Sequence, residues 1–366
     1  MDEARIGVIG VGLIGKSHVE GYAGIPGARV VAVADIDEAE ARHVAQRWNV
    51  PAVHRDFREL LARDDIDAVD VCLHNNLHAP VAIQALRAGK HVYCEKPIAG
   101  SYADGRAMVE AARESGRMLH VQLATLYQRE TKAARRLIEQ GELGRVYYAR
   151  SVGYRRRGRP FVDGYGAPFF VRRETAGGGA LLDMGVYHIS QMLWLLGQPQ
   201  AERISGRTYQ ETSMDEARRA ASGYDVEELA LGFCRLQGGI TLEVIEAWAI
   251  HLGPGEGSCV AGSRGGVRLS PFSFHTTQGD VPWDMTTDLG DLETRLHRLE
   301  PAYGAYDSSQ RHWVAALRGE VPLLPSAALA LETMLISEGI YLSERLGREV
   351  TAAEVRAASQ STALHL

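Results

Sequence analysis

The chain has 366 residues, of which 45% are hydrophobic and 23% charged, and its formal net charge is −6. This composition is typical of a globular protein, and the length exceeds what one small core usually supports, so we expect two domains. The acidic balance disfavours broad nucleic-acid binding, which usually requires a basic domain, although residues 155–159 form a local basic cluster.

The sequence also gives expectations about compartment and metals. No apolar run reaches the ~18 residues that a membrane span needs, and the acidic first residues do not resemble a secretory signal. The four cysteines, Cys72, Cys94, Cys234 and Cys259, form neither a CxxC pair nor a zinc-ligand spacing. We therefore expect a cytoplasmic protein with no metal site and no membrane partner.

The first third of the chain alternates apolar strands with helices. Strands are predicted at 5–10, 28–35, 66–73, 90–96 and 117–124, and helices at 12–25, 37–48, 57–63, 81–89 and 101–115. Residues 28–35 form a continuous apolar run, which is typical of a strand buried on both faces. The alternation predicts an α/β domain, with a doubly wound parallel sheet, over residues 1–125.

A glycine-rich run joins the first predicted strand to the first helix. It reads Gly10-Val11-Gly12-Leu13-Ile14-Gly15, a GxGxxG motif, and the next strand ends in Asp35, twenty residues after Gly15. In this context the motif indicates a Rossmann dinucleotide-binding loop, with a tight turn at Gly10, close approach of pyrophosphate at Gly12 and close helix packing at Gly15. Leu13 and Ile14, at the start of the helix, join the predicted cofactor-binding residues.

Asp35 decides between the two nicotinamide cofactors. Its carboxylate can accept a hydrogen bond from a ribose 2′-hydroxyl but would repel a 2′-phosphate, and the following residues, Ile36 and Asp37, provide no cation. The sequence therefore predicts NAD and disfavours NADP.

The pattern changes after about residue 125. Helices are predicted at 130–140 and 180–197, a long strand at 145–156, and a loop rich in Gly, Pro and Arg at 157–179. Residues 201–290 are mostly strand and turn, and 307–318 and 326–346 are helical. Residues 126–366 should form an α+β domain with an open, mainly antiparallel sheet that also serves homo-oligomerisation, while the C-terminal helices could pack back on the first domain. A cleft between domains is the expected ligand site.

Two stretches carry candidate catalytic side chains. Lys96 ends a predicted strand and precedes Pro97, which favours extended backbone at the lysine. In the helix at 180–197, Asp183 and Tyr187 are four residues apart and share a face, while His188 follows one residue later. The alternative is that Lys96 is a solvated loop residue, Asp183 a cap and His188 a satisfied core histidine. Oxidation of an alcohol by a nicotinamide cofactor needs a base, and lysine, tyrosine and histidine can all serve.

Together these stretches resemble the family of glucose–fructose oxidoreductase, inositol dehydrogenase and rhizopine-catabolism proteins, the Gfo/Idh/MocA family. The resemblance rests on motifs spread over most of the chain: GVIGVGLIG, VVAVAD, IDAVDVCLHNNLHAP, AGKHVYCEKPIA, RRLIEQGELG and GGGALLDMGVYHISQMLWLLG. It implies a Rossmann domain, a second domain with an open sheet, a sugar, cyclitol or related polyol substrate, and commonly a dimer or tetramer.

The resemblance also assigns roles to residues. The family's catalytic lysine falls on Lys96, whose bond to Pro97 is often cis in the family, and its aspartate falls on Asp183. The acid/base, usually histidine, falls four residues later on Tyr187, with His188 one place beyond. Helix spacing favours Tyr187, whereas the titration range of histidine favours His188.

Further contacts follow from the same resemblance. The loop with His74 and Asn75, where the family more often has Thr-Pro-Asn-His, is expected under the nicotinamide. Cofactor contacts are also expected from His78, Glu95 and Lys96. The sugar pocket is expected to involve Tyr154, Arg156, Asp163 and His188.

The sequence thus predicts an NAD-dependent dehydrogenase that oxidises a secondary hydroxyl of a sugar, glycoside or cyclitol. Two other functions stay open: a keto-sugar reductase, which uses the same site in the reverse direction, and a dinucleotide-binding regulator without turnover. An intact pair of Lys96 and Asp183 disfavours the regulator, because a sensor needs no proton acceptor.

Overall fold

The computed structural model describes residues 2–253 and 255–366, which divide into two compact units. The first unit comprises residues 2–122, 300–328 and 361–366, and the second comprises 123–253, 255–299 and 329–360. The division near residue 122 lies close to the predicted one at 125. Residues 300–328 and 361–366 belong to the first unit; the sequence prediction counted them in the second domain and allowed its C-terminal helices to pack back on the first.

The first unit contains a six-stranded parallel sheet in the order β3-β2-β1-β4-β5-β6. This is the strand order of a doubly wound dinucleotide-binding fold, as predicted. Its strands are β1 (Ala4–Ile9), β2 (Ala28–Ala34), β3 (Ala52–His54), β4 (Ala68–Val71), β5 (His91–Cys94) and β6 (Leu119–Val121). Its helices are α1 (Leu13–Ala23), α2 (Glu38–Trp48), α3 (Phe57–Leu61), α4 (Asn75–Arg87), α5 (Tyr102–Ser115), η4 (Tyr303–Tyr306) and α11 (Ser309–Leu317).

Two details of this unit differ from the sequence prediction. Strand β3 was not predicted, because three residues carry no periodic signal, so Lys96 follows the fifth strand and not the fourth. Helix α4 begins at Asn75, five residues before Pro80, which we had interpreted as its start. A proline at this helical position removes only one intrahelical hydrogen bond, and the helix accommodates it.

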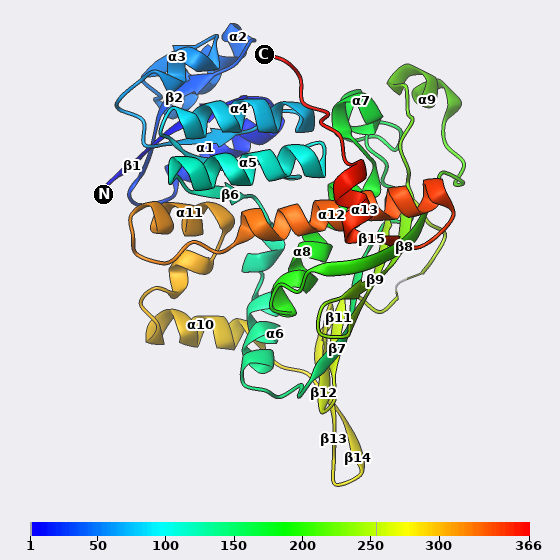
Figure 1. Ribbon diagram of the computed structural model, residues 1–366. Coiled ribbons are helices and arrows are strands. Elements are labelled where there is room, and N and C mark those ends of the chain that lie inside the picture. Colours follow the sequence, from blue (N-terminus) through cyan, green and yellow to red (C-terminus); the bar gives the residue numbers. More distant parts are fainter. Residues whose placement is uncertain (1, 254) are drawn as a thin grey trace. The chain divides into compact units, whose positions relative to one another are not determined.

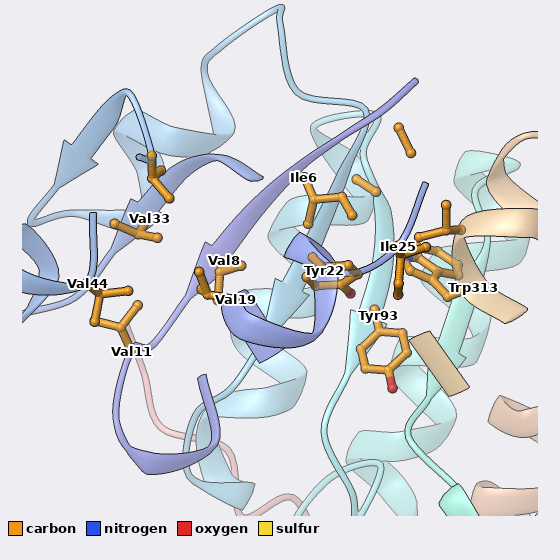
Figure 2. Close-up of a cluster of buried hydrophobic side chains, with 14 of the residues drawn as sticks. Ile6, Val8, Val11, Val19, Tyr22, Ile25, Val33, Val44, Tyr93 and Trp313 are labelled. Carbon is orange, nitrogen blue, oxygen red and sulfur yellow. The ribbon is translucent and has the colours of Figure 1, made fainter. Parts of the chain in front are cut away.

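The core of the first unit is built largely from β-branched side chains of its central strands. Ile6 and Val8 of β1 and Val33 of β2 are completely buried, and they pack with residues of α1 such as Val19 and Tyr22 (Figure 2). Trp313 of α11 joins the same cluster beside Tyr93, which explains why a segment distant in sequence belongs to this unit.

The second unit contains a nine-stranded sheet in the order β14-β13-β12-β11-β7-β10-β9-β8-β15. One pair, β7 with β10, is parallel and the others are antiparallel, so the open sheet is mainly antiparallel as predicted. The strands are β7 (Val146–Tyr154), β8 (Ala201–Tyr209), β9 (Leu229–Leu236), β10 (Ile240–Ala247), β11 (Cys259–Gly262), β12 (Gly265–Leu269), β13 (Phe272–Gln278), β14 (Val281–Met285) and β15 (Val350–Thr351). The hairpin of β13 and β14 projects from the rest of the sheet (Figure 1).

The helical segments of the second unit are η1 (Ala124–Tyr127), α6 (Arg129–Glu139), η2 (Pro168–Val171), α7 (Arg173–Ala176), η3 (Leu181–Gly185), α8 (Val186–Leu195), α9 (Glu216–Ser222), α10 (Leu289–Leu299), α12 (Ser326–Leu346) and α13 (Ala352–Ala358). Helix α12 begins in the first unit and continues in the second. Its Ile340 packs against Gly206 of β8 and Gly232 of β9, where a β-carbon would lie 2.7 Å and 2.5 Å from Ile340. This close packing identifies the helix-covered face of the sheet.

Among the described residues, no helix combines the length and apolarity that a membrane crossing would require. Helix α9 was not predicted and interrupts a region interpreted as strand and turn. Helices α10 and α13 were not predicted either.

Candidate active site

The carboxyl ends of the central parallel strands lie side by side in the first unit. Ile9 of β1 pairs with Ala34 of β2 and with Val71 of β4, and Val71 pairs with Cys94 of β5. The loops that follow these four strands therefore emerge at one edge of the sheet. Open parallel sheets bind their ligands at this edge.

The glycine loop at this edge has the shape that a dinucleotide requires. Gly10 has φ +89°, and a β-carbon there would lie 2.4 Å from the carbonyl oxygen of Cys72. A β-carbon at Gly15 would lie 1.9 Å from the carbonyl oxygen of Gly10, so helix α1 approaches the loop very closely. At Gly12, by contrast, a β-carbon would meet no atom within 4 Å, which leaves the loop backbone accessible to a phosphate. The exposed side chains of Leu13 and Ile14 follow on the first turn of α1.

Asp35 is tied to this loop. One of its carboxylate oxygens accepts a hydrogen bond from the backbone N–H of Val11 at 2.7 Å, and the other accepts one from the N–H of Asp37 at 2.9 Å. Each oxygen keeps a second lone pair for a ribose hydroxyl. The residues present thus fit a dinucleotide with a free 2′-hydroxyl.

The loop after β4 places His74 and Asn75 at the same edge. His74 is the N-cap residue of α4 and Asn75 is its first residue. Burial lowers the pKa of His74, which favours the neutral ring. His78 is completely buried, with Nδ1 2.8 Å from the carbonyl oxygen of Pro97 and Nε2 3.0 Å from that of Leu73. Its ring therefore links the loop after β4 to the loop after β5.

Lys96 follows β5 and is partly buried, and its bond to Pro97 is cis. The preceding Glu95 is buried and accepts a hydrogen bond from the backbone N–H of Lys96 at 3.0 Å. Its other oxygen lies 2.9 Å from Nε2 of His18. Glu95 thus faces the protein interior and holds the backbone of Lys96.

His18 bridges two carboxylates inside the Rossmann domain. Its Nδ1 lies 2.9 Å from Oδ2 of Asp70, which also accepts a hydrogen bond from the hydroxyl of Tyr22. Burial opposes a charge on His18, but the neighbouring Asp70 more than compensates and holds the pKa of His18 far above its usual value. The imidazolium in turn keeps the pKa of Glu95 below its usual range despite burial. The linked side chains of Asp70, His18 and Glu95 were not predicted from the sequence.

The helix that carries Asp183 starts with an unexpected turn. Residues Leu181–Gly185 form a π turn, and the α-helical pattern resumes at Val186. The i→i+5 spacing of a π turn rotates the following residues relative to an ordinary helix, and such turns are frequent at functional sites. The face shared by Asp183 and Tyr187 in a regular helix is therefore altered.

The π turn brings Asp183 and His188 to the same strand end. A carboxylate oxygen of Asp183 accepts a hydrogen bond from Nε1 of the buried Trp248 at 2.9 Å. Nδ1 of His188 lies 2.9 Å from Oε2 of Glu246, which precedes Trp248 by two residues in the chain. Tyr187 lies between them in sequence, and its carbonyl oxygen accepts a hydrogen bond from the hydroxyl of Thr125 at 2.8 Å.

The charge state of His188 reflects these neighbours. Burial lowers its pKa and so does the positive charge of Arg155, but the charge and hydrogen bond of Glu246 outweigh both, so the net pKa is raised. The side chain of His188 is 25% exposed, whereas that of Glu246 has no exposure. Leu242, Val244 and Glu246 alternate along β10, and all three are buried on the same face. A glutamate at a position where this alternation predicts a buried residue needs a partner, and this was the available sequence signal.

Tyr165 is a further residue that was not predicted from the sequence. It is 43% exposed, and its hydroxyl accepts a hydrogen bond from Nη1 of Arg155 at 2.6 Å. Partial burial and the charge of Asp183 raise its pKa to about 12 against the opposing effect of Arg155, so the phenol is protonated at neutral pH. Its position between two glycines in a long loop was the available signal.

Tyr154, Arg156 and Asp163, which were predicted to shape the sugar pocket, have different surroundings. The hydroxyl of Tyr154 donates to the carbonyl oxygen of Gly253 at 2.8 Å, and strand alternation places its side chain on the face opposite to that of Gly153, which adjoins His188. Asp163 is bound at 2.9 Å by the completely buried Arg159, so its carboxylate holds the loop. Arg156 is exposed.

The amino-terminal and middle parts of the chain match two protein-family models. Residues 4–123 match the model described as "Oxidoreductase family, NAD-binding Rossmann fold". Residues 131–268 match the model described as "GFO/IDH/MocA C-terminal domain".

Curated proteins and solved structures extend these matches. The chain is 30% identical to 1,5-anhydro-D-fructose reductase of Ensifer adhaerens over 249 residues, 67% of this chain and 69% of that protein. It is 27% identical to D-glucoside 3-dehydrogenase of Escherichia coli over 305 residues, 81% of this chain and 86% of that protein. An oxidoreductase from Agrobacterium radiobacter, solved with NAD⁺, L-tartaric acid and magnesium, has the same fold with a TM-score of 0.76 at 21% identity, covering 96% of this chain and 99% of that one.

Proposed function

The chain belongs to the Gfo/Idh/MocA family of NAD-binding oxidoreductases, and we propose that it oxidises a secondary hydroxyl of a sugar, glycoside or cyclitol. The similarity to D-glucoside 3-dehydrogenase over most of both chains supports this substrate class. The observation that carries the proposal is the placement of Asp183 and His188 at one strand end by the π turn. Alcohol oxidation needs a base that takes the hydroxyl proton, and His188 can supply it.

Each residue has a role in the proposed reaction. Bound NAD supplies the hydride acceptor. His188 takes the hydroxyl proton, because its ring is partly exposed and histidine changes charge near neutral pH. Lys96 binds the reacting oxygen and lowers the cost of its developing negative charge. Asp183 accepts hydrogen bonds from the substrate.

The residues proposed to bind the cofactor also have separate roles. Gly10, Gly12 and Gly15 shape the loop for the pyrophosphate, and the N-terminus of α1 provides amide donors and a favourable dipole. Asp35 binds the ribose 2′-hydroxyl and sets the preference for NAD over NADP. His74 and Asn75 contact the nicotinamide end.

The proposed function is tested by a dehydrogenation screen. The purified protein is incubated with NAD and a panel of sugars, methyl glycosides and inositols, and NADH is followed by its absorbance. We expect turnover with at least one cyclic polyol and weaker turnover with NADP. Turnover of no member of the panel, in either the oxidising direction or the reverse direction with keto-sugars, would contradict the proposal.

We also propose that the protein forms a homo-oligomer through the face of the second unit's sheet that its helices leave uncovered. Phe233 of β9 lies on this face, because its neighbour Gly232 packs against Ile340 on the other, and Phe233 is 49% exposed. Phe233 is a large apolar side chain exposed on an inner strand of the sheet, and contact with a second copy of the chain would remove it from water. A cytoplasmic location is part of the same proposal, supported by four free cysteines of which Cys94 and Cys234 are completely buried.

A further inference from the structure

A completely buried glutamate lies behind the histidine that we assign as the base. Oε2 of Glu246 is 2.9 Å from Nδ1 of His188, and Oε1 accepts a hydrogen bond from the hydroxyl of Ser151 at 2.9 Å. Both oxygens of Glu246 are therefore engaged, and no part of its side chain is exposed. A buried charge of this kind is costly unless its partners satisfy it.

The neighbouring strand makes room for this pair. Gly153 of β7 is the register partner of Glu246 of β10. A β-carbon at Gly153 would lie 2.1 Å from Cε1 and 2.3 Å from Nδ1 of His188, and 2.7 Å from Oε2 of Glu246. The histidine ring can lie against the sheet only because this position has no side chain.

We propose that Glu246 is a positioning residue for the oxidation, which holds His188 in the tautomer with the proton on Nδ1 and the lone pair on Nε2. The proposal rests on the assignment of His188 as the base under the proposed function. A carboxylate accepts but does not donate, so the nitrogen facing it must carry the proton, and the other nitrogen is left as the acceptor. The residues Ser151 and Gly153 fix the carboxylate and the ring in this arrangement.

The arrangement also supports the chemical step. The substrate C–H bond breaks with hydride transfer to NAD⁺, the O–H bond breaks with proton transfer to Nε2 of His188, and the carbonyl forms. His188 becomes an imidazolium, whose charge Glu246 stabilises, as a carboxylate does behind a histidine base in other enzymes. Arg155 is a further charged group that acts on the ring, and it opposes protonation.

The test compares Glu246→Gln with a matched control on the same strand. Glu243 lies on the opposite face of β10, where it binds Arg150 at 2.8 Å, so Glu243→Gln also neutralises a paired glutamate. For Glu246→Gln we expect kcat to fall about 10–10²-fold with unchanged NAD affinity, and the acid limb of the kcat profile to move to lower pH because His188 loses a stabilising charge. Glu243→Gln should leave kcat and the position of the acid limb unchanged.

A second readout does not depend on turnover. The ¹⁵N chemical shifts of the His188 ring report which nitrogen is protonated, and they should show Nδ1–H in the wild type and a mixture of tautomers in Glu246→Gln. Unchanged ring shifts and an unchanged acid limb in Glu246→Gln would overturn the proposal. Absence of wild-type turnover would instead overturn the proposed function, while the ring shifts still measure what Glu246 does to His188.

Gly153→Ala covers the case in which Glu246→Gln does not fold. This variant retains both ionisable groups, and its backbone conformation is one that alanine adopts, but its methyl group displaces the ring from Glu246. We expect a similar loss of kcat and the same change in ring shifts. Full kcat with wild-type ring shifts in Gly153→Ala would overturn the proposal.

Discussion

Asp183 and His188 are five residues apart in sequence, yet both bind to the carboxyl end of strand β10. Asp183 binds the indole of Trp248, and His188 binds Glu246 two residues earlier. The π turn at Leu181–Gly185 accounts for this, since its longer spacing replaces the four-residue period that pairs side chains on a regular helix. Substitution of each residue can therefore test whether His188 or Tyr187 is the base.

We expect His188→Asn to lower kcat by about 10²–10⁴-fold, because it removes the proton acceptor. Tyr187→Phe, the matched control on the adjacent residue, should lower kcat by less than about tenfold. Steady-state kinetics with the best substrate from the screen measures both. A severe loss in Tyr187→Phe together with a mild one in His188→Asn would assign the base to Tyr187.

Lys96→Ala should lower turnover by at least ~10²-fold, because the variant lacks the charge that stabilises the reacting oxygen. NAD affinity, measured by calorimetry, should change little. Lys96→Arg is the companion variant: it retains the charge but alters the geometry, so partial activity would separate the two effects. Full turnover in Lys96→Ala would show that the lysine has no catalytic role.

Asp35→Ala should weaken NAD binding more than NADP binding, because it loses the acceptor for the 2′-hydroxyl and the repulsion of a 2′-phosphate. Asp37→Ala is a suitable control, since Asp37 caps helix α2 through the N–H of Glu40 on the same loop. The Asp37→Ala variant should have a free energy of unfolding lower by about 1 kcal/mol and an unchanged cofactor preference. An unchanged ratio of the two affinities in Asp35→Ala would contradict the assignment.

His18 should make the stability of the first unit depend on pH. Its pKa is raised in the folded state, so its contribution is complete below the unfolded value of about 6.5 and is lost progressively as the pH rises above it. The slope is at most about 1.4 kcal/mol per pH unit. Urea unfolding at pH 7, 8 and 9 should therefore show a steeper decline for the wild type than for His18→Asn, and parallel curves would indicate that His18 is neutral.

Phe233→Glu should shift the protein toward monomers if the uncovered face of the sheet is an interface. A charge at this position would have to be desolvated in the oligomer. Leu299→Glu, at an exposed position at the end of α10, is the control and should not alter the association state. Analytical ultracentrifugation distinguishes the species, and a 40 kDa monomer for the wild type would refute the oligomer outright.

Much of the first unit could be predicted because its signals are local. Continuous apolar strands, glycine punctuation and the spacing from Gly15 to Asp35 identify the parallel sheet and its loop without knowledge of tertiary contacts. Strand β3 was missed because three residues are too few for a period to be visible. Helix α9 was missed because it is short and lies among strands.

The candidate site was less predictable because its geometry depends on tertiary contacts. Nothing in the letters LLDMG distinguishes a π turn from an α-helical one, so the partner of Asp183 was assigned from regular spacing. Glu246 and His188 are 58 residues apart, and only the packing of the helix on the sheet joins them. Asp163 was predicted to contact substrate from the family resemblance, and in the structure its carboxylate binds the buried Arg159, a partner that the resemblance did not indicate.

The bond between Asp35 and the backbone of Val11 has a consequence for redesigning the enzyme. This carboxylate shapes the glycine loop before any nucleotide arrives, which reduces the ordering cost of binding. Changing Asp35 alone to accept NADP would therefore remove a support of the loop along with the selectivity. An efficient switch of cofactor would need a second substitution that restores an acceptor for the Val11 N–H.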